Sequence, residues 1–234
     1  LLFVPGFGGT FAADESEAGV NEWLLNPGLA PAKLGLEPLT QAYDNIVRSF
    51  DNIGYTLDSD FFVALWDWRV PVALDVSAYD GSLPEETFDG QLSSVTGATL
   101  FDSISDGLFD SGLSYLSYWL DLAANTWASL HGGIAPDAVD IVTHSTGGLV
   151  ARSYIQSAAY KDTYDGRQLP LVHNLVQVGV PNEGVSNTYN LLENDFSQKL
   201  ASRVLGLITG QAFELIQSGQ SLSLPNGTST ITQA

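Results

Sequence analysis

The sequence predicts an α/β protein with a mostly parallel sheet and helices on both faces. Short apolar runs typical of buried strands alternate with longer segments of helical periodicity, and glycine or proline ends most of these segments. The order strand, helix, strand, helix recurs along the chain, as parallel sheets require. At 234 residues and 44% hydrophobic composition, the chain is long enough to bury a sizeable core.

The first part of the chain contains two predicted strands and one predicted helix. Residues 1–4 form an apolar run ended by a Pro-Gly pair, which is typical of a buried parallel strand entering a loop. Over residues 39–53, apolar side chains recur at three- and four-residue spacing. We therefore expect a helix whose polar side starts at Thr40 or Asp44. Residues 61–66 form the next apolar run and predict a second buried strand.

The alternation continues after a segment of different composition. Residues 75–112 are rich in Asp, Gly and Ser, and we interpret them as an insertion with one short amphipathic helix near residues 100–109. The elements expected next are a helix at 113–133, a strand at 139–143, a helix at 148–160 and a strand at 171–181. This order predicts parallel strands joined by helices.

Residues 185–234 differ in kind from the rest of the chain. They begin with a helical pattern that is apolar on one side and end in small, polar residues. We therefore expect an α/β core over residues 1–184 and the start of a helical cap, or lid, over residues 185–234; a helix packed on the core is the alternative. Because no further strand is predicted, we expect the fold to be incomplete at its C-terminus.

Charge and composition exclude several classes of partner. The formal net charge of −19 repels phosphate groups, so we expect no nucleic-acid partner. No apolar run reaches the roughly 18 residues that a membrane-spanning helix needs. The absence of cysteine excludes disulfides and thiolate ligands, and the excess of acidic residues favours a secreted or salt-adapted protein.

One group of acidic residues raises the question of a metal site. Asp102, Asp106 and Asp110 fall four residues apart, on one face if that segment is helical. Their spacing does not fit the alternating oxygen ligands and invariant glycine of an EF-hand loop. A solvated helix face is the interpretation we prefer, with calcium as the alternative. We expect no metal and no cofactor.

The stretch VDIVTHSTGGLVARSYI, residues 139–155, passes from an apolar strand through Ser145 into a helix. A sharp turn at this junction would expose the serine hydroxyl above the sheet, at the amino end of the helix. Such a turn needs small residues two positions to either side; Gly147 is one, whereas Thr143 replaces the first glycine of the G-x-S-x-G pattern. Ser145 is therefore the candidate nucleophile, and a helix N-cap is the alternative.

A glycine-bearing loop, VPGFGGT at residues 4–10, follows the first predicted strand. Acyl transfer from an ester builds negative charge on the carbonyl oxygen, which two main-chain amides can stabilise. Where a serine turn is used, one amide follows the nucleophile and the other lies in a loop after an early strand. The N–H groups of Thr146 and Phe7 would take these roles. An ordinary strand-to-helix turn explains the glycines but not their pairing with Ser145.

Taken together, the motifs VPGFGGT, YDNIVRSFDNIGY, FFVALWDWR, VTHSTGGLVARSYI and LVQVGVPNEGV occur in a family-like order and spacing. In this respect the chain resembles the lecithin:cholesterol acyltransferase-like branch of the α/β-hydrolases, which includes phospholipases and bacterial lipases. The resemblance covers residues 1–185 without the insertion. It implies an α/β-hydrolase fold, with Ser145 as nucleophile and the Phe7 and Thr146 amides as the oxyanion hole.

The resemblance also implies roles for neighbouring residues. Asp67 and Arg69 in WDWR look like the family's structural pair near the site, and His144 is expected to pack within the serine turn. Trp66 and Trp68 either line an acyl pocket or belong to the core.

A hydroxyl nucleophile needs a base, and in this family Asp or Glu and then His follow the serine along the chain. The chain has three histidines, of which His131 and His144 precede the nucleophile. His173 falls at the start of a strand, at the wrong end of the sheet for Ser145. We therefore expect the acid and base to come from the remaining C-terminal part of the protein or from a separate polypeptide.

The function expected from these features is hydrolysis of carboxylic esters, of lipids in particular, through an acyl-enzyme on Ser145. One alternative is acyl transfer to another alcohol. Another is a noncatalytic binding or assembly module that keeps the scaffold but lacks the acid and base.

Overall fold

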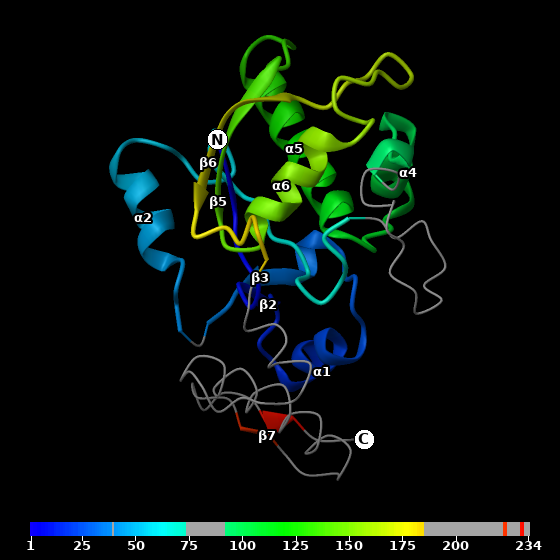
Figure 1. Cartoon of the computed structure of the whole chain (residues 1–234). Coiled ribbons are helices and arrows are strands. Elements are labelled where there is room, and N and C mark those ends of the chain that lie inside the picture. The colour runs from blue at the N-terminus through cyan, green and yellow to red at the C-terminus, as the bar shows by residue number, and fades with distance from the viewer. Residues whose placement is uncertain (39, 74–91, 185–221, 224–229, 232–234) are drawn as a thin grey trace. The chain divides into compact units, whose positions relative to one another are not determined.

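A computed structural model of the chain describes residues 1–38, 40–73, 92–184, 222–223 and 230–231 (Figure 1). Residues 75–91 of the predicted insertion and nearly all of the predicted cap lie outside these residues. The chain divides into two compact units, one of residues 1–13 with 26–180, the other of residues 14–25 with 181–234.

The first unit is built on a four-stranded sheet, which confirms the predicted mostly parallel sheet. Its strands are β1 (Leu2–Val4), β4 (Phe62–Val63), β5 (Ala138–His144) and β6 (Leu171–Val178). They pair in parallel in the order β4-β1-β5-β6. The strand predicted over residues 61–66 pairs only over β4, because the chain leaves the sheet after Val63.

Helices cover both faces of this sheet, as predicted (Figure 1). On one face lies α2 (Asp44–Asn52), whose apolar side packs on a cluster that includes Phe3 and Phe61. On the other face are α5 (Gly112–Leu130) and α6 (Gly147–Gln156), and α4 (Gly97–Asp106) packs against α5.

Of the two positions predicted for the start of the polar side of α2, the helix starts at Asp44, because Gln41 adopts a left-handed φ of 53° and the Thr40 and Ala42 amides donate to the Glu37 carboxylate instead of entering a helix. The bounds of two other helices need correction. Helix α6 ends at Gln156 rather than at residue 160, because Ser157 has an extended backbone. Helix α4 spans residues 97–106 rather than 100–109. Thr96 caps its start, and Gly107, with φ 66°, ends it.

A small antiparallel sheet in the first unit was not predicted. It pairs β2 (Thr10–Ala12) with β3 (Leu34–Leu36), directly after a 3-10 turn at Pro31–Lys33. Each strand has three residues, too few to show a periodic pattern.

The second unit contains α1 (Glu17–Leu25) and the short antiparallel pair β7 (Leu222–Ser223) and β8 (Thr230–Ile231). Helix α1 contacts β8. The sequence patterns predicted none of these three elements.

The strand order places a topological switch between β1 and β5. The chain leaves β1 to form β4 on one side, whereas it leaves β5 to form β6 on the other side. In open parallel sheets, the loops at the carboxyl ends of two such strands diverge and leave a crevice where ligands bind. The loop after β1 and the turn after β5 both lie at this position.

Helix α6 approaches β1 so closely that a side chain at Gly147 would not fit. An added Cβ there would lie 2.5 Å from the Pro5 carbonyl oxygen and closer still to that of Val4. We expect Gly147→Ala to reduce the free energy of unfolding by about 1–3 kcal/mol, as overpacking does.

Urea unfolding followed by circular dichroism measures this loss. Gly35→Ala is the matched control, because its added methyl would lie 3.4 Å or more from its neighbours, at ordinary contact distance. The close packing of α6 on β1 is refuted if the two variants lose the same stability.

Candidate active site

Ser145 occupies a strained turn between β5 and α6. Its φ is 52°, a left-handed value that residues other than glycine rarely adopt. Its N–H donates to the Val178 carbonyl at 3.0 Å, and its own carbonyl accepts from the Gly148 amide at 3.1 Å. These two hydrogen bonds therefore hold the strained backbone in place. Backbone strain that is held in this way is found most often at functional sites.

Small residues surround this turn where the packing is closest. Gly147 lies against the carbonyls of Val4 and Pro5, and a Cβ on Gly148 would overlap the Val180 side chain. Thr143, which replaces the usual glycine two positions before the serine, is fully buried and donates its hydroxyl to the Val176 carbonyl at 3.2 Å. A threonine is therefore accommodated here.

The loop after β1 forms a tight turn beside Ser145. The Gly9 amide donates to the Gly6 carbonyl at 3.0 Å, and Gly8 has a φ of 74°, as the third residue of a type II turn requires. A Cβ added to Gly6 would lie 2.6 Å from the Ser145 Cβ and 3.2 Å from its Oγ. The main chain of this loop therefore lies directly against the serine side chain.

The two amides singled out from the sequence lie on either side of this contact. Phe7 follows Gly6 in the loop, and Thr146 follows Ser145 in the turn. In the described part of the chain, neither N–H donates to another group. Thr146 also lies at the amino end of α6, where the helix dipole favours negative charge.

The WDWR segment braces the loop after β1. The Trp66 indole donates to the Pro5 carbonyl at 2.8 Å, and the Trp68 indole donates to the Thr10 carbonyl at 2.9 Å. Trp66 is 2% exposed and belongs to the core, whereas the Trp68 ring lies 4.5 Å from the half-exposed Phe7 ring. Both tryptophans therefore contact this loop, and Trp68 also packs against the Phe7 ring.

Asp67 and Arg69 form a bidentate ion pair. The guanidinium Nε donates to Oδ1 at 2.8 Å and NH2 to Oδ2 at 2.7 Å. Asp67 is fully buried and also accepts from the Gly28 amide at 2.9 Å. The pair ties the WDWR segment to the chain near Gly28 and does not hydrogen-bond to Ser145.

His144 faces the α2 side of the sheet. Its Nδ1 lies 2.9 Å from the Tyr43 hydroxyl, which also accepts from the Gly6 amide at 3.0 Å. Its ring nitrogen is therefore engaged with Tyr43, and in the described part of the chain it makes no hydrogen bond to the Ser145 hydroxyl. Sequence patterns place Tyr43 only on a predicted helix face, because its hydrogen-bond partners are far away along the chain.

The other two histidines lie far from Ser145. His131 follows α5 and precedes β5, so it lies at the amino end of the strand whose carboxyl end leads into Ser145; it stacks on Trp127. His173 lies five residues before Val178, the partner of His144 in the sheet, which is about 16 Å along the strand. Since the structure describes all three histidines of the chain, none of them serves as a base for Ser145 in this arrangement.

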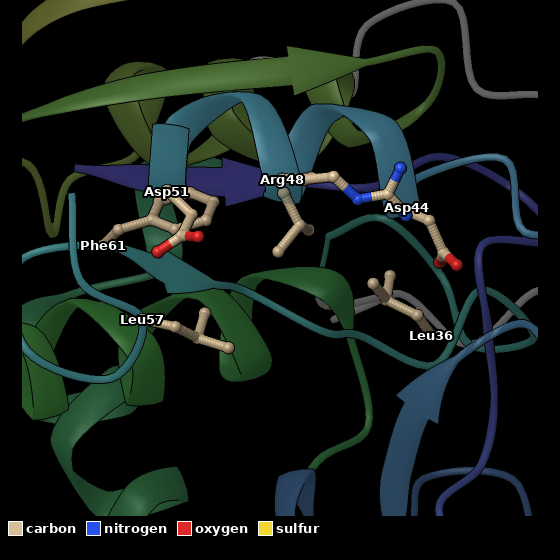
Figure 2. A pocket seen from close by; sticks show the side chains of 7 residues that line it. Leu36, Asp44, Arg48, Asp51, Leu57 and Phe61 are labelled. Atoms are coloured by element: carbon tan, nitrogen blue, oxygen red, sulfur yellow. The ribbon is translucent and has the colours of Figure 1, made fainter. Parts of the chain in front are cut away.

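Two hollows lie on the α2 side of the first unit. One of about 270 Å³ is lined by residues that include Tyr43, Thr143 and His144. The other, of about 390 Å³, is lined by α2 and the segments below it, and Figure 2 shows Asp44 and Arg48 projecting from that helix. Neither is lined by Ser145.

The described residues give no support for a metal site. They contain no group of three or more His, Asp or Glu side chains placed to hold an ion. Asp102 and Asp106 lie on α4, whereas Asp110 lies beyond its end and accepts from the Ser114 hydroxyl at 2.9 Å. The helices in the described ranges are also too short or too polar to cross a membrane.

Comparison of the chain with protein-family models, curated proteins and solved structures gave no match. The residues of the site and their geometry are therefore the basis for assigning a function.

The contribution of the buried Asp67–Arg69 ion pair to stability can be measured by removing its cation. We expect Arg69→Met to reduce the free energy of unfolding by about 3–5 kcal/mol, because it leaves the fully buried Asp67 carboxylate without its cation.

The matched control is Arg167→Met, which breaks an ion pair to Asp121 whose arginine side chain is 53% exposed. This change also removes a contact with the Phe101 ring, and together the two losses are about 2 kcal/mol or less. Denaturant unfolding of both variants gives the comparison. Equal losses would contradict a supporting role for the Asp67–Arg69 pair.

Proposed function

We propose that the protein is a serine esterase that hydrolyses carboxylic esters, lipid esters among them. The observation that carries this proposal is the contact of Gly6 with Ser145. It sets a strained serine turn against a loop whose Phe7 amide donates to no other group in the described part of the chain. The resemblance to the lecithin:cholesterol acyltransferase-like α/β-hydrolases supports the same assignment.

In the proposed reaction, the Ser145 oxygen attacks the acyl carbonyl carbon and its proton passes to a base. Negative charge then develops on the carbonyl oxygen, which the Phe7 and Thr146 amides stabilise. The ester C–O bond breaks, the alcohol leaves with a proton, and the acyl group remains on Ser145. Attack by water on this acyl-enzyme releases the acid and restores the serine.

The base in this proposal is not one of the three histidines of the chain, given their positions. We propose that it comes from another segment of the protein or from a partner polypeptide. The half-exposed Phe7 ring, in contact with Trp68, provides an apolar surface on the loop that contacts Ser145, and such a surface suits an acyl chain.

A fluorophosphonate probe tests the nucleophile directly. In the full-length protein we expect the probe to form a covalent adduct on Ser145, located by peptide mapping. Ser145→Ala should abolish the adduct and reduce hydrolysis of p-nitrophenyl butyrate by more than about 1000-fold.

The control is Ser105→Ala, which removes an exposed serine on α4 whose hydroxyl donates to the Asp102 carbonyl. It should keep full labelling. A full-length protein that takes up no probe, or a Ser145→Ala variant that still hydrolyses the ester, would favour the noncatalytic binding module instead.

The proposed oxyanion donor can be removed without changing a reacting side chain. Phe7→Pro deletes the amide hydrogen, and we expect kcat/KM to fall by about 100–1000-fold, the usual effect of losing one such donor.

Phe7→Ala keeps the amide and removes the ring, so it is the matched control. We expect it to change KM for long acyl chains more than kcat. The two variants are compared by steady-state kinetics on short- and long-chain esters. A loss of kcat as large in Phe7→Ala as in Phe7→Pro would show that the ring, and not the amide, matters.

A further inference from the structure

The Tyr43 hydroxyl links the two loops that meet at Ser145. It accepts a hydrogen bond from the Gly6 amide at 3.0 Å and lies 2.9 Å from His144 Nδ1. A hydroxyl can accept and donate at the same time, so one oxygen serves both the Gly6 amide and the imidazole nitrogen of His144. One side chain thus bridges the loop after β1 and the last residue of β5.

The position of Tyr43 is itself fixed by several contacts. Its ring lies 5.3 Å from that of Phe3 in the core, and a Cβ on Gly9 would lie 2.7 Å from the Tyr43 Cε2 atom. The preceding turn is held by the buried Glu37 carboxylate, which accepts from the Ala42 amide, while the Glu37 amide donates to the Gly9 carbonyl at 3.1 Å. Glu37 and Tyr43 are therefore each tied to the loop after β1.

The bridge acts on the peptide group that carries the proposed oxyanion donor. The Gly6 carbonyl and the Phe7 amide belong to one planar peptide unit. The Gly9 amide holds the carbonyl side of that unit, and Tyr43 holds the Gly6 amide directly before it. The direction of the Phe7 N–H is thus set by bonds on both sides of Gly6.

We propose that Tyr43 is a positioning residue, whose hydroxyl joins the Gly6 amide to the His144 side chain and so fixes the Phe7 and Thr146 amides relative to Ser145. This inference rests on the function proposed above. Burial raises the pKa of the Tyr43 hydroxyl, and the negative charge of Glu37 raises it further, whereas the hydrogen bond from the Gly6 amide lowers it. Because the net effect is an increase, the hydroxyl stays protonated throughout the neutral range.

The test removes the hydroxyl alone. Tyr43→Phe keeps the ring contacts but leaves the Gly6 amide without its acceptor. A displacement of about 1 Å in a catalytic group can reduce a rate by about 100-fold. We expect kcat for p-nitrophenyl butyrate and the rate of fluorophosphonate labelling to fall by about 10- to 100-fold, with KM within about threefold of the wild type.

Tyr55→Phe is the matched control. Tyr55 also packs in the aromatic cluster under α2, against Phe50 and Phe61, but its hydroxyl makes no hydrogen bond in the described part of the chain. We expect its kcat and labelling rate to equal those of the wild type. If Tyr43→Phe also matches the wild type, the positioning role is overturned.

Substitutions at His144, the second partner of the Tyr43 hydroxyl, provide an independent test. His144→Leu removes the nitrogen that bonds to Tyr43, whereas His144→Asn places a side-chain amide near the position of Nδ1. We expect the Asn variant to exceed the Leu variant several-fold in kcat, and the double variant Tyr43→Phe/His144→Leu to lose little more than Tyr43→Phe alone. Strictly additive losses would show that the two residues do not act through one bond.

Hydrogen exchange of the Gly6 amide separates this inference from the proposed function. By ¹⁵N NMR, the Tyr43→Phe change should accelerate exchange at Gly6 at least 10-fold relative to Tyr55→Phe, whatever the activity. A wild type that takes up no probe refutes the esterase. A labelled wild type in which Tyr43→Phe leaves both Gly6 exchange and kcat unchanged refutes only the positioning role.

Discussion

The arrangement around Ser145 depends on the absence of a side chain at Gly6. The loop after β1 and the turn after β5 leave adjacent parallel strands, so they reach the same edge of the sheet. The two loops touch there because the Gly6 backbone lies against the Ser145 side chain. A Cβ added at Gly6 would lie only 2.6 Å from the Ser145 Cβ, so no side chain fits at this position. The same requirement for closeness recurs at Gly147, where α6 meets the end of β1.

A contact this close is useful only if both partners are rigid, and long-range hydrogen bonds provide that rigidity. Trp66 and Trp68 hold one side of the loop after β1 through the carbonyls of Pro5 and Thr10, and Tyr43 holds Gly6 from the α2 side. A left-handed serine is unfavourable in isolation, by about 1–3 kcal/mol. It persists because the strand before it and the helix after it are both anchored in the core.

What could be predicted from the sequence is what local patterns encode. The apolar run before Ser145, the glycines after it and the periodic helix beyond are contiguous. The structure confirms β5 and the start of α6 within one residue of their predicted bounds, whereas α6 ends four residues before its predicted end. The β2–β3 pair and the bridge through Tyr43 depend on residues far apart in the chain, the latter joining positions 101 residues apart. A pattern within a short stretch of sequence cannot reveal a contact between residues so far apart. From the sequence, Tyr43 is therefore interpreted as one more apolar residue on a helix.

The positions of the histidines divide the proposed chemistry into two separable parts. In the proposed reaction, the serine and the two amides lie where β1, β5 and α6 meet and are held there by Tyr43, Trp66 and Trp68, whereas proton transfer requires a group outside the three histidines of the chain. In serine hydrolases, donors and substrate binding without a working triad still accelerate the reaction by about 10³–10⁴-fold over water. Electrostatic positioning and base catalysis are thus distinct contributions, and in this proposal the described residues supply the first of them.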